Sequence, residues 1–195
     1  MRKACNQTAW GLIFLLLDIR IGFLDILPDL IGVILILAGL GRLKQEHTYF
    51  STAWIMTWLL LPLSITEWFI FVDIPLGNGL DQIPAAALVL QVTGALVRLT
   101  VLYTICRAVQ VMAEKQRKIM LRNAAKLRLQ WYLFFEGGWL IVMPFGFNMD
   151  ANDFTLMFMG FAVGLIASTL AVILLIRKSG NILKSTPKHK IDIRV

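Results

Sequence analysis

Six apolar runs separated by short polar segments constrain the fold of this chain more than any other feature of its sequence. They cover residues 4–20, 28–41, 51–71, 83–107, 129–147 and 154–176. About 20 helical residues cross the hydrocarbon core of a bilayer, which is about 30 Å thick. Of the 195 residues, 58% are hydrophobic, and the mean hydropathy is +0.73. Such values exceed those of soluble domains. We therefore predict an all-α fold, a polytopic membrane bundle of six transmembrane helices in three hairpins, which forms a single domain over residues 1–195.

The distribution of basic residues predicts how this bundle is oriented. Of the 19 Lys and Arg residues, 17 lie at the N-terminus, between runs two and three, between runs four and five, or after run six. Cytoplasmic segments of membrane proteins carry such an excess of basic residues. We expect both termini to be cytoplasmic, including a basic tail over residues 177–195. The net charge of +7 does not favour nucleic-acid binding, because the basic residues flank the apolar runs.

An acidic stretch inside the first hairpin is the leading candidate for a functional site. Only 38 residues, 4–41, separate Lys3 from Arg42, whereas two full crossings use about 40. The carboxylates of the turn should therefore lie below the membrane surface, where unpaired charges are costly. We predict a binding site for a proton, a cation or a lipid head group. Its residues are Asp18, Arg20, Asp25, Asp29 and Glu67.

The same stretch also has a purely structural interpretation, in which its acids cap two short helices at a turn and reach water. Pro28 suits the first turn of a helix, because the amide hydrogen that proline lacks would be unpaired there. Asp29 would then lie beside free backbone N–H groups that stabilise its charged form. Asp25 precedes the proline and lacks these donors, so we expect it to be the residue that takes up and releases a proton.

Two further features place polar or small residues inside the apolar runs. Arg98 lies near the middle of the fourth run, and Glu136 lies seven residues into the fifth. We expect the two to form an intramembrane ion pair, either as a charge relay or as a contact that fixes helix register. Gly160, Gly164 and Ser168 recur every four residues. They predict close helix packing, within the chain or in a homodimer.

Basic residues between the fourth and fifth runs recur every three or four positions. They are Lys115, Lys118, Arg122 and Lys126. At this spacing they would share one face of a short cytoplasmic helix or helix extension. Such a face suits the head groups of anionic lipids. Alternatively, these residues only determine the topology of the chain in the membrane.

Residues that carry catalytic or metal chemistry are otherwise sparse. Cys5 and Cys106 are the two cysteines, and His47 and His189 are the two histidines; none has a partner at metal-ligand spacing. No pairing of a nucleophile with a base is apparent either. We therefore expect no metal, no cofactor and no enzymatic activity.

The segment from Asp25 to Gly32, followed by an apolar run to Arg42, resembles the opening hairpin of small uncharacterised polytopic membrane proteins of Gram-positive bacteria. The resemblance covers about the first fifth of the chain. It implies a bacterial plasma membrane and brings no activity with it.

These patterns leave two classes of function open. The leading hypothesis is a membrane protein that binds or transports a small solute, an ion or a lipid head group through the first-hairpin site. The alternative is a non-catalytic accessory or assembly protein of the membrane. A transporter predicts a water-filled path that reaches the acids, whereas an accessory protein predicts a filled bundle with an exposed face of small residues.

Overall fold

The computed structural model of the protein describes residues 1–17, 26–67 and 84–184, with the side chains of these residues except at positions 26–28, 67 and 151. This part of the chain is all-helical and contains no β-strand. It forms six α-helices and one 3-10 helix: α1 (Arg2–Leu16), α2 (Ile26–Leu43), α3 (Thr48–Glu67), α4 (Ala85–Lys115), α5 (Ile119–Val142), η3 (Met143–Asn148) and α6 (Ala151–Ile182).

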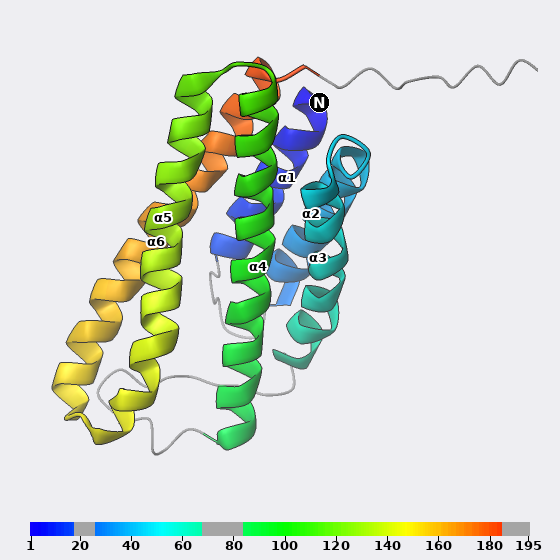
Figure 1. The fold of residues 1–195 in the computed structure, drawn as a ribbon. Coiled ribbons are helices and arrows are strands. Elements are labelled where there is room, and N and C mark those ends of the chain that lie inside the picture. The colour runs from blue at the N-terminus through cyan, green and yellow to red at the C-terminus, as the bar shows by residue number, and fades with distance from the viewer. Residues whose placement is uncertain (18–25, 68–83, 185–195) are drawn as a thin grey trace, which may run out of the picture.

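The α-helices pack side by side and close into a ring (Figure 1). Each helix contacts the next one along the chain, and α6 completes the ring by packing against α1. Residues 44–47 and 116–118 are short connections, so α2 and α3 form one antiparallel pair and α4 and α5 form another. As a result, the N-terminus, the α4–α5 turn and the end of α6 all lie at the same end of the bundle (Figure 1).

Among the described residues, three helices are long and apolar enough to cross a membrane, which supports a membrane protein. They are Thr48–Thr66, Ala85–Lys115 and Asn152–Ile182, whose 18-residue apolar windows have mean hydropathies of 1.2, 1.8 and 2.5. By comparison, α1 has only 15 residues, and α5 carries several charged side chains along its 24 residues. The predicted class, all-helical and membrane-embedded, is confirmed at this level.

Three helices extend beyond the apolar runs from which they were predicted. α4 ends eight residues later, at Lys115; α5 begins ten residues earlier, at Ile119; and α6 ends six residues later, at Ile182. The additional turns are rich in charged residues, which are good helix formers but lower the local hydropathy. Hydropathy therefore located the apolar part of each helix and missed its polar continuation.

Two predicted runs are shorter as α-helices than the sequence indicated. α1 ends at Leu16 rather than at residue 20. α5 gives way after Val142 to η3, which has a proline in its first two positions. That residue, Pro144, cannot donate the backbone hydrogen bond that an α-helix requires, so the fifth run is α-helical only as far as Val142.

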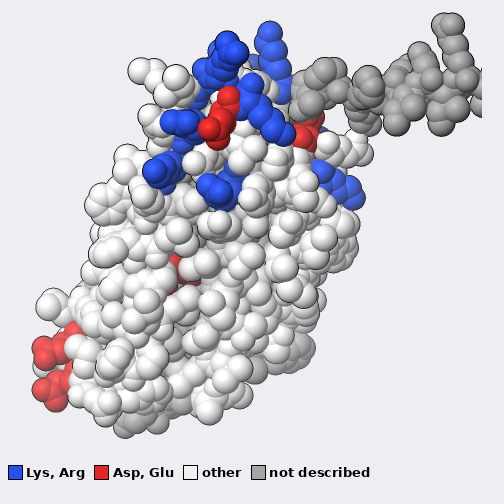
Figure 2. Space-filling view, viewed as in Figure 1, with Lys and Arg blue, Asp and Glu red and all other residues white. Residues whose placement is uncertain are grey.

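Basic side chains gather at one end of the bundle, which we call the basic end (Figure 2). It is formed by the start of α1, the α2–α3 and α4–α5 connections and the end of α6, and it includes Arg2, Lys3, Lys44, Lys118, Arg122 and Lys184. The first residues of α6 at the opposite end carry Asp150 and Asp153 instead. Charge therefore changes sign along the long axis of the bundle.

Most of the hydrophobic core lies in the half of the bundle next to the basic end. Its largest fully buried side chains come from α2, α3, α4 and α6, and they include Leu40, Leu43, Phe50, Ile105, Val109, Leu175 and Ile176. A smaller buried cluster joins α4, α5, η3 and α6 towards the opposite end. The half next to the basic end is thus closely packed.

α1 and α2 approach each other closely, and glycines, which have no side chain, lie at their points of contact. A Cβ atom added to Gly11 would lie 2.6 Å from the carbonyl oxygen of Gly32, and one added to Gly32 would lie 2.8 Å from that of Gly11. Nearer the basic end, a Cβ atom on Gly39 would collide with the side chain of Thr8. The two helices therefore meet through their backbones, as small-residue interfaces in membranes do.

The small residues of α6 differ along the helix. Gly164 lies against the ring of Phe135 from α5, which leaves no room for a Cβ atom. Ser168 is buried, and its hydroxyl donates a 3.0 Å hydrogen bond to the carbonyl oxygen of Leu165 in its own helix. A Cβ atom on Gly160 would meet nothing within 4 Å. The stripe packs inside the chain at Gly164 and is open at Gly160.

We predict that Gly11→Ala destabilises the protein, because the added methyl group would overlap the backbone of α2. Overpacking of this kind costs about 1–3 kcal/mol. The matched control is Gly160→Ala, which adds the same methyl group to open space and gains roughly 1 kcal/mol of helix propensity. Thermal unfolding of the purified protein in detergent compares the two. If Gly11→Ala unfolded at the same temperature as Gly160→Ala, or higher, the α1–α2 contact would not be tight.

Candidate functional site

Within the described residues, two cavities lie between the helices. The larger cavity, of about 320 Å³, is partly open and is lined by residues of α4, α5, η3 and α6. The central cavity, of about 180 Å³, is lined by side chains from all six α-helices. Arg98, Glu136, Leu165 and Ile166 line both cavities. These four residues therefore stand where the two cavities adjoin.

Arg98 and Glu136 are the charged residues at this junction, and both lie deep within the bundle. Arg98 is about 20 Å along α4 from Ala85, and Glu136 is about 26 Å along α5 from Ile119. Glu136 is only 6% exposed. The sequence predicted that these two residues would pair, and the structure brings them to the walls of the same cavities.

The two side chains interact electrostatically across the cavities. No direct ion pair or hydrogen bond joins them among the residues that the structure describes. A guanidinium has five N–H donors and a carboxylate has about four acceptor sites. Both groups thus face the cavities with hydrogen-bonding capacity that the described side chains leave unused.

Tyr132 adds a third polar group to the central cavity. It lies four residues before Glu136 on α5, so the two side chains share one face of the helix. Tyr132 is 3% exposed, and within the described ranges its hydroxyl has no hydrogen-bond partner. Thr169 of α6 also lines this cavity. The central cavity therefore combines apolar walls with a few polar groups at one side, as small-molecule sites do.

Gln91 is a further polar residue that lines the larger cavity. It lies seven residues before Arg98 on α4, on the same helix face. Its side-chain oxygen is fully enclosed and has no hydrogen-bond donor in the described part of the chain. An enclosed amide oxygen without a donor is unfavourable.

Aromatic rings form the apolar wall of the larger cavity. Trp139 of α5 lies with its ring centre 5.3 Å from that of Phe158 and 6.0 Å from that of Phe161, both on α6. All three residues line the cavity. The larger cavity is thus bounded by Arg98, Glu136 and Gln91 on its polar side and by these rings on its apolar side.

The predicted site in the first hairpin falls largely outside the described residues. Asp18, Arg20 and Asp25 belong to the stretch 18–25, and the side chain of Glu67 is not described. Asp29 is described and lies in the first turn of α2, as predicted, although the helix begins at Ile26 rather than at residue 28. The proposed roles of these acids therefore remain predictions.

The four basic residues predicted to share a helix face do not lie on one helix. α4 ends at Lys115, and α5 begins only after Lys118. The turn between them contains Arg117 with a φ of 54°, in the left-handed region. Arg122 and Lys126 lie on α5. The even spacing in the sequence missed this turn, which is made by a non-glycine residue and so carries no glycine or proline signal.

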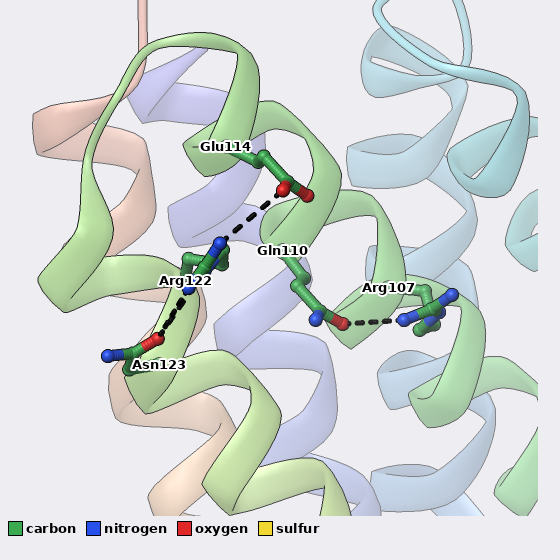
Figure 3. Close-up of polar contacts among 5 residues, drawn as sticks. All are labelled: Arg107, Gln110, Glu114, Arg122 and Asn123. Carbon is green, nitrogen blue, oxygen red and sulfur yellow. Dashed lines mark hydrogen bonds and ion pairs between the residues drawn. The ribbon is translucent and has the colours of Figure 1, made fainter.

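Polar contacts at the basic end hold the α4–α5 turn together (Figure 3). The Arg122 guanidinium lies 3.4 Å from the Glu114 carboxylate, so it joins the start of α5 to the end of α4. Arg107 donates a 2.8 Å hydrogen bond to the side-chain oxygen of Gln110 one turn later. Both contacts stay within α4 and α5.

His47 has a structural role at the basic end. Its Nδ1 accepts a 3.2 Å hydrogen bond from the backbone N–H of Tyr49, which caps the start of α3. Partial burial and, secondly, the positive charge of Lys115 lower the pKa of His47, which favours the neutral form that can accept this bond. Among the described residues no cluster of His, Cys, Asp or Glu is suited to a metal ion.

Sequence reasoning found Arg98 and Glu136 but missed the residues that complete the site. Gln91, Tyr132 and Trp139 are common residue types in membrane helices and carry no motif. Their helical spacing from the two charges was the available signal: Gln91 precedes Arg98 by seven residues, and Tyr132 precedes Glu136 by four. Applying that spacing to both helices would have selected Gln91 and Tyr132.

Comparisons of the chain with protein-family models, with curated proteins and with solved structures find no match. The chemistry of the two cavities is therefore defined by the residues that line them.

We predict that Arg98→Leu destabilises the protein, because the buried Glu136 carboxylate loses a countercharge at mid-depth. Adding Glu136→Leu should restore much of the stability, with a coupling energy of about 0.5–3 kcal/mol between the two sites. Thermal unfolding of the two single variants and the double variant measures this coupling.

The control for this coupling is Arg122→Leu combined with Glu136→Leu. Arg122 is a partly exposed residue at the basic end, 14 residues from Glu136 along α5. These two substitutions should add to within about 0.5 kcal/mol. Equal additivity for Arg98 and Glu136 would mean that the two charges do not stabilise each other.

Proposed function

We propose that this protein is a multi-pass protein of the plasma membrane that binds a small polar solute or ion in the interior of its helix bundle. The observation that carries this proposal is the junction of the two cavities, where Arg98 and Glu136 face open space at mid-depth. Ionisable side chains are rare inside membranes and usually face a cavity or a partner, because burying them in hydrocarbon is costly. Here their unused hydrogen-bonding capacity favours a ligand.

All six α-helices cross the membrane in this proposal, which adds α1, α2 and α5 to the three helices named above. Large apolar side chains are exposed on the added helices as well. Ile34 on α2 is 51% exposed, and Phe134 and Ile141 on α5 are 64% and 69% exposed. In a soluble protein such exposed apolar surface would favour aggregation. In a bilayer it contacts lipid tails.

Orientation follows from the charge on the two ends of the bundle. Basic residues are retained on the cytoplasmic side of a membrane. We therefore assign the basic end, with both termini, to the cytoplasm, and Asp150 and Asp153 to the outside. The resemblance of residues 25–42 to proteins of Gram-positive bacteria supports a bacterial plasma membrane. Anionic lipid head groups are the natural partners of Lys115, Lys118, Arg122 and Lys126.

The packing between the cavities and the basic end bears on whether the protein transports its ligand. The half next to the basic end is filled by fully buried apolar side chains. Transport would require this half to open while the other closes, as in alternating access. This conformation thus supports binding, and transport would additionally require the conformational change. The acids of the first hairpin, of which Asp29 is the described member, would then contribute polar groups on the side opposite the basic end.

An accessory or assembly protein remains the second candidate, and one observation favours it. Gly160 has open space beside it, and its neighbours Leu156 and Val163 are 76% and 67% exposed. A second helix could approach closely at this point, in a homodimer or in a complex. This candidate predicts association through α6 and no ligand in the cavities.

We predict that a cysteine in place of Asn152, an exposed residue at the start of α6, is labelled from outside intact cells by a membrane-impermeant maleimide. A cysteine in place of Lys118, exposed at the basic end, should be labelled only after permeabilisation. The native Cys5 and Cys106 are buried, so their background should be low. The reverse labelling pattern would overturn the orientation.

Filling the larger cavity should abolish ligand binding. Ala162 lines this cavity, and we predict that Ala162→Phe removes the thermal stabilisation conferred by the best members of a panel of amino acids, sugars, organic acids, amines and salts. A ligand at about 100 times its Kd stabilises a protein by about 2.7 kcal/mol. The matched control is Val163→Phe, because Val163 is the next residue and is 67% exposed.

Val163→Phe should respond to the same compounds as the parent protein. If no compound in the panel stabilises the parent, or if Ala162→Phe responds as the parent does, the larger cavity is not the binding site.

A further inference from the structure

The chemistry around the larger cavity also bears on the class of ligand. We propose that the site takes a small zwitterion, whose anionic group binds Arg98 and whose ammonium group binds Glu136, with its apolar part against Trp139 and Phe161. This inference rests on the proposed function, because it requires the cavity to be a binding site. It goes beyond that function in assigning a charge pattern to the ligand.

Opposite charges that share a cavity without a direct bond are the first ground for this assignment. Arg98 and Glu136 line the same space, and the described residues provide neither with a hydrogen-bonded counterion. A ligand with a single charge would engage one of them and leave the site with a net charge in a low-dielectric environment, which is unfavourable. A zwitterion engages both and leaves the net charge of the site unchanged.

Gln91 adds an uncharged polar side chain to the lining of the same cavity. Its side-chain oxygen is fully enclosed, so it does not face the cavity as Arg98 and Glu136 do. The charge pattern of the ligand is therefore assigned from Arg98 and Glu136.

The size and the aromatic lining of the larger cavity restrict the class of ligand further. The cavity of about 320 Å³ lies at the lower end of the range of small-molecule sites, which is about 300–1,000 Å³. Trp139, Phe158 and Phe161 form its apolar wall, and aromatic faces also attract cations. The site therefore suits a compact zwitterion with an apolar or methylated body.

Two sources provide this chemistry. One is a free amino acid or betaine, and the other is the head group of a zwitterionic phospholipid that enters between helices. Both present one cationic and one anionic group a few bonds apart. The experiment distinguishes them by controlling the lipid.

The test uses the full chain in nanodiscs made only of phosphatidylglycerol, which has no cationic group. Its thermal unfolding midpoint is measured with a zwitterion mixture of leucine, phenylalanine and glycine betaine. Matched mixtures contain 3-methylbutylamine and phenethylamine, or 4-methylpentanoate and 3-phenylpropanoate. A second set of nanodiscs contains phosphatidylethanolamine. We expect the zwitterion mixture or phosphatidylethanolamine to raise the midpoint, and the single-charge mixtures to bind at least about tenfold more weakly.

Substitutions test the two charged groups that the ligand would contact. Glu136→Gln and Arg98→Gln should each weaken binding of the zwitterions, whereas Arg122→Gln at the basic end should leave it unchanged. Ala162→Phe removes no charge and fills the cavity, so it keeps the test informative if either charge variant fails to fold.

The outcomes separate this inference from the function on which it rests. Equal stabilisation by single-charge and zwitterionic compounds, or by sugars alone in the wider panel, would overturn the zwitterion and retain the cavity as a binding site. Absence of any effect from the zwitterions and from phosphatidylethanolamine would also overturn it. Failure of the whole panel to stabilise the parent protein, or a response of Ala162→Phe equal to that of the parent, would instead remove the larger cavity as a binding site.

Discussion

Backbone contact between α1 and α2 is the constraint on which the ring of helices depends. α1 is the helix that joins the beginning of the ring to its end, because it packs against both α2 and α6. Glycines lie at both of these interfaces: Gly11 faces Gly32 of α2, and a Cβ atom on Gly180 of α6 would lie 2.7 Å from the Cβ of Cys5. Close approach on both sides of one short helix brings the two ends of the chain together, so the six helices enclose an interior.

The interior enclosed in this way is divided along its length. Large aliphatic and aromatic side chains fill it next to the basic end, whereas at mid-depth Arg98, Tyr132 and Glu136 replace them and two cavities remain. Polar side chains there cannot pack as apolar ones do, because each keeps a hydrogen-bonding group that needs a partner. The same sequence that closes the ring thus provides both a sealed half and a polar site.

The sequence predicted the parts of this arrangement that depend on composition along a single helix. Apolar runs gave the all-helical membrane class, and a charge inside an apolar run singled out Arg98 and Glu136. The sequence analysis did not predict the helix ends, because polar segments that include Lys115 and Arg122 extend α4 and α5 beyond the apolar runs. Nor did it predict the cavities, since the central one is lined by all six helices and its volume depends on how their side chains meet. The first-hairpin hypothesis lies largely outside the described residues.

The closely packed half next to the basic end also determines where the membrane voltage acts. An electric field falls across dry, low-dielectric material and hardly at all across water-filled space. In a membrane, part of the potential would therefore drop across the layer that contains Phe50, Ile105 and Ile176. Moving one elementary charge across the full potential changes its energy by about 2.3 kcal/mol per 100 mV. A zwitterion carries no net charge through that layer, so its exchange between the site and the cytoplasm would be insensitive to the energised state of the cell.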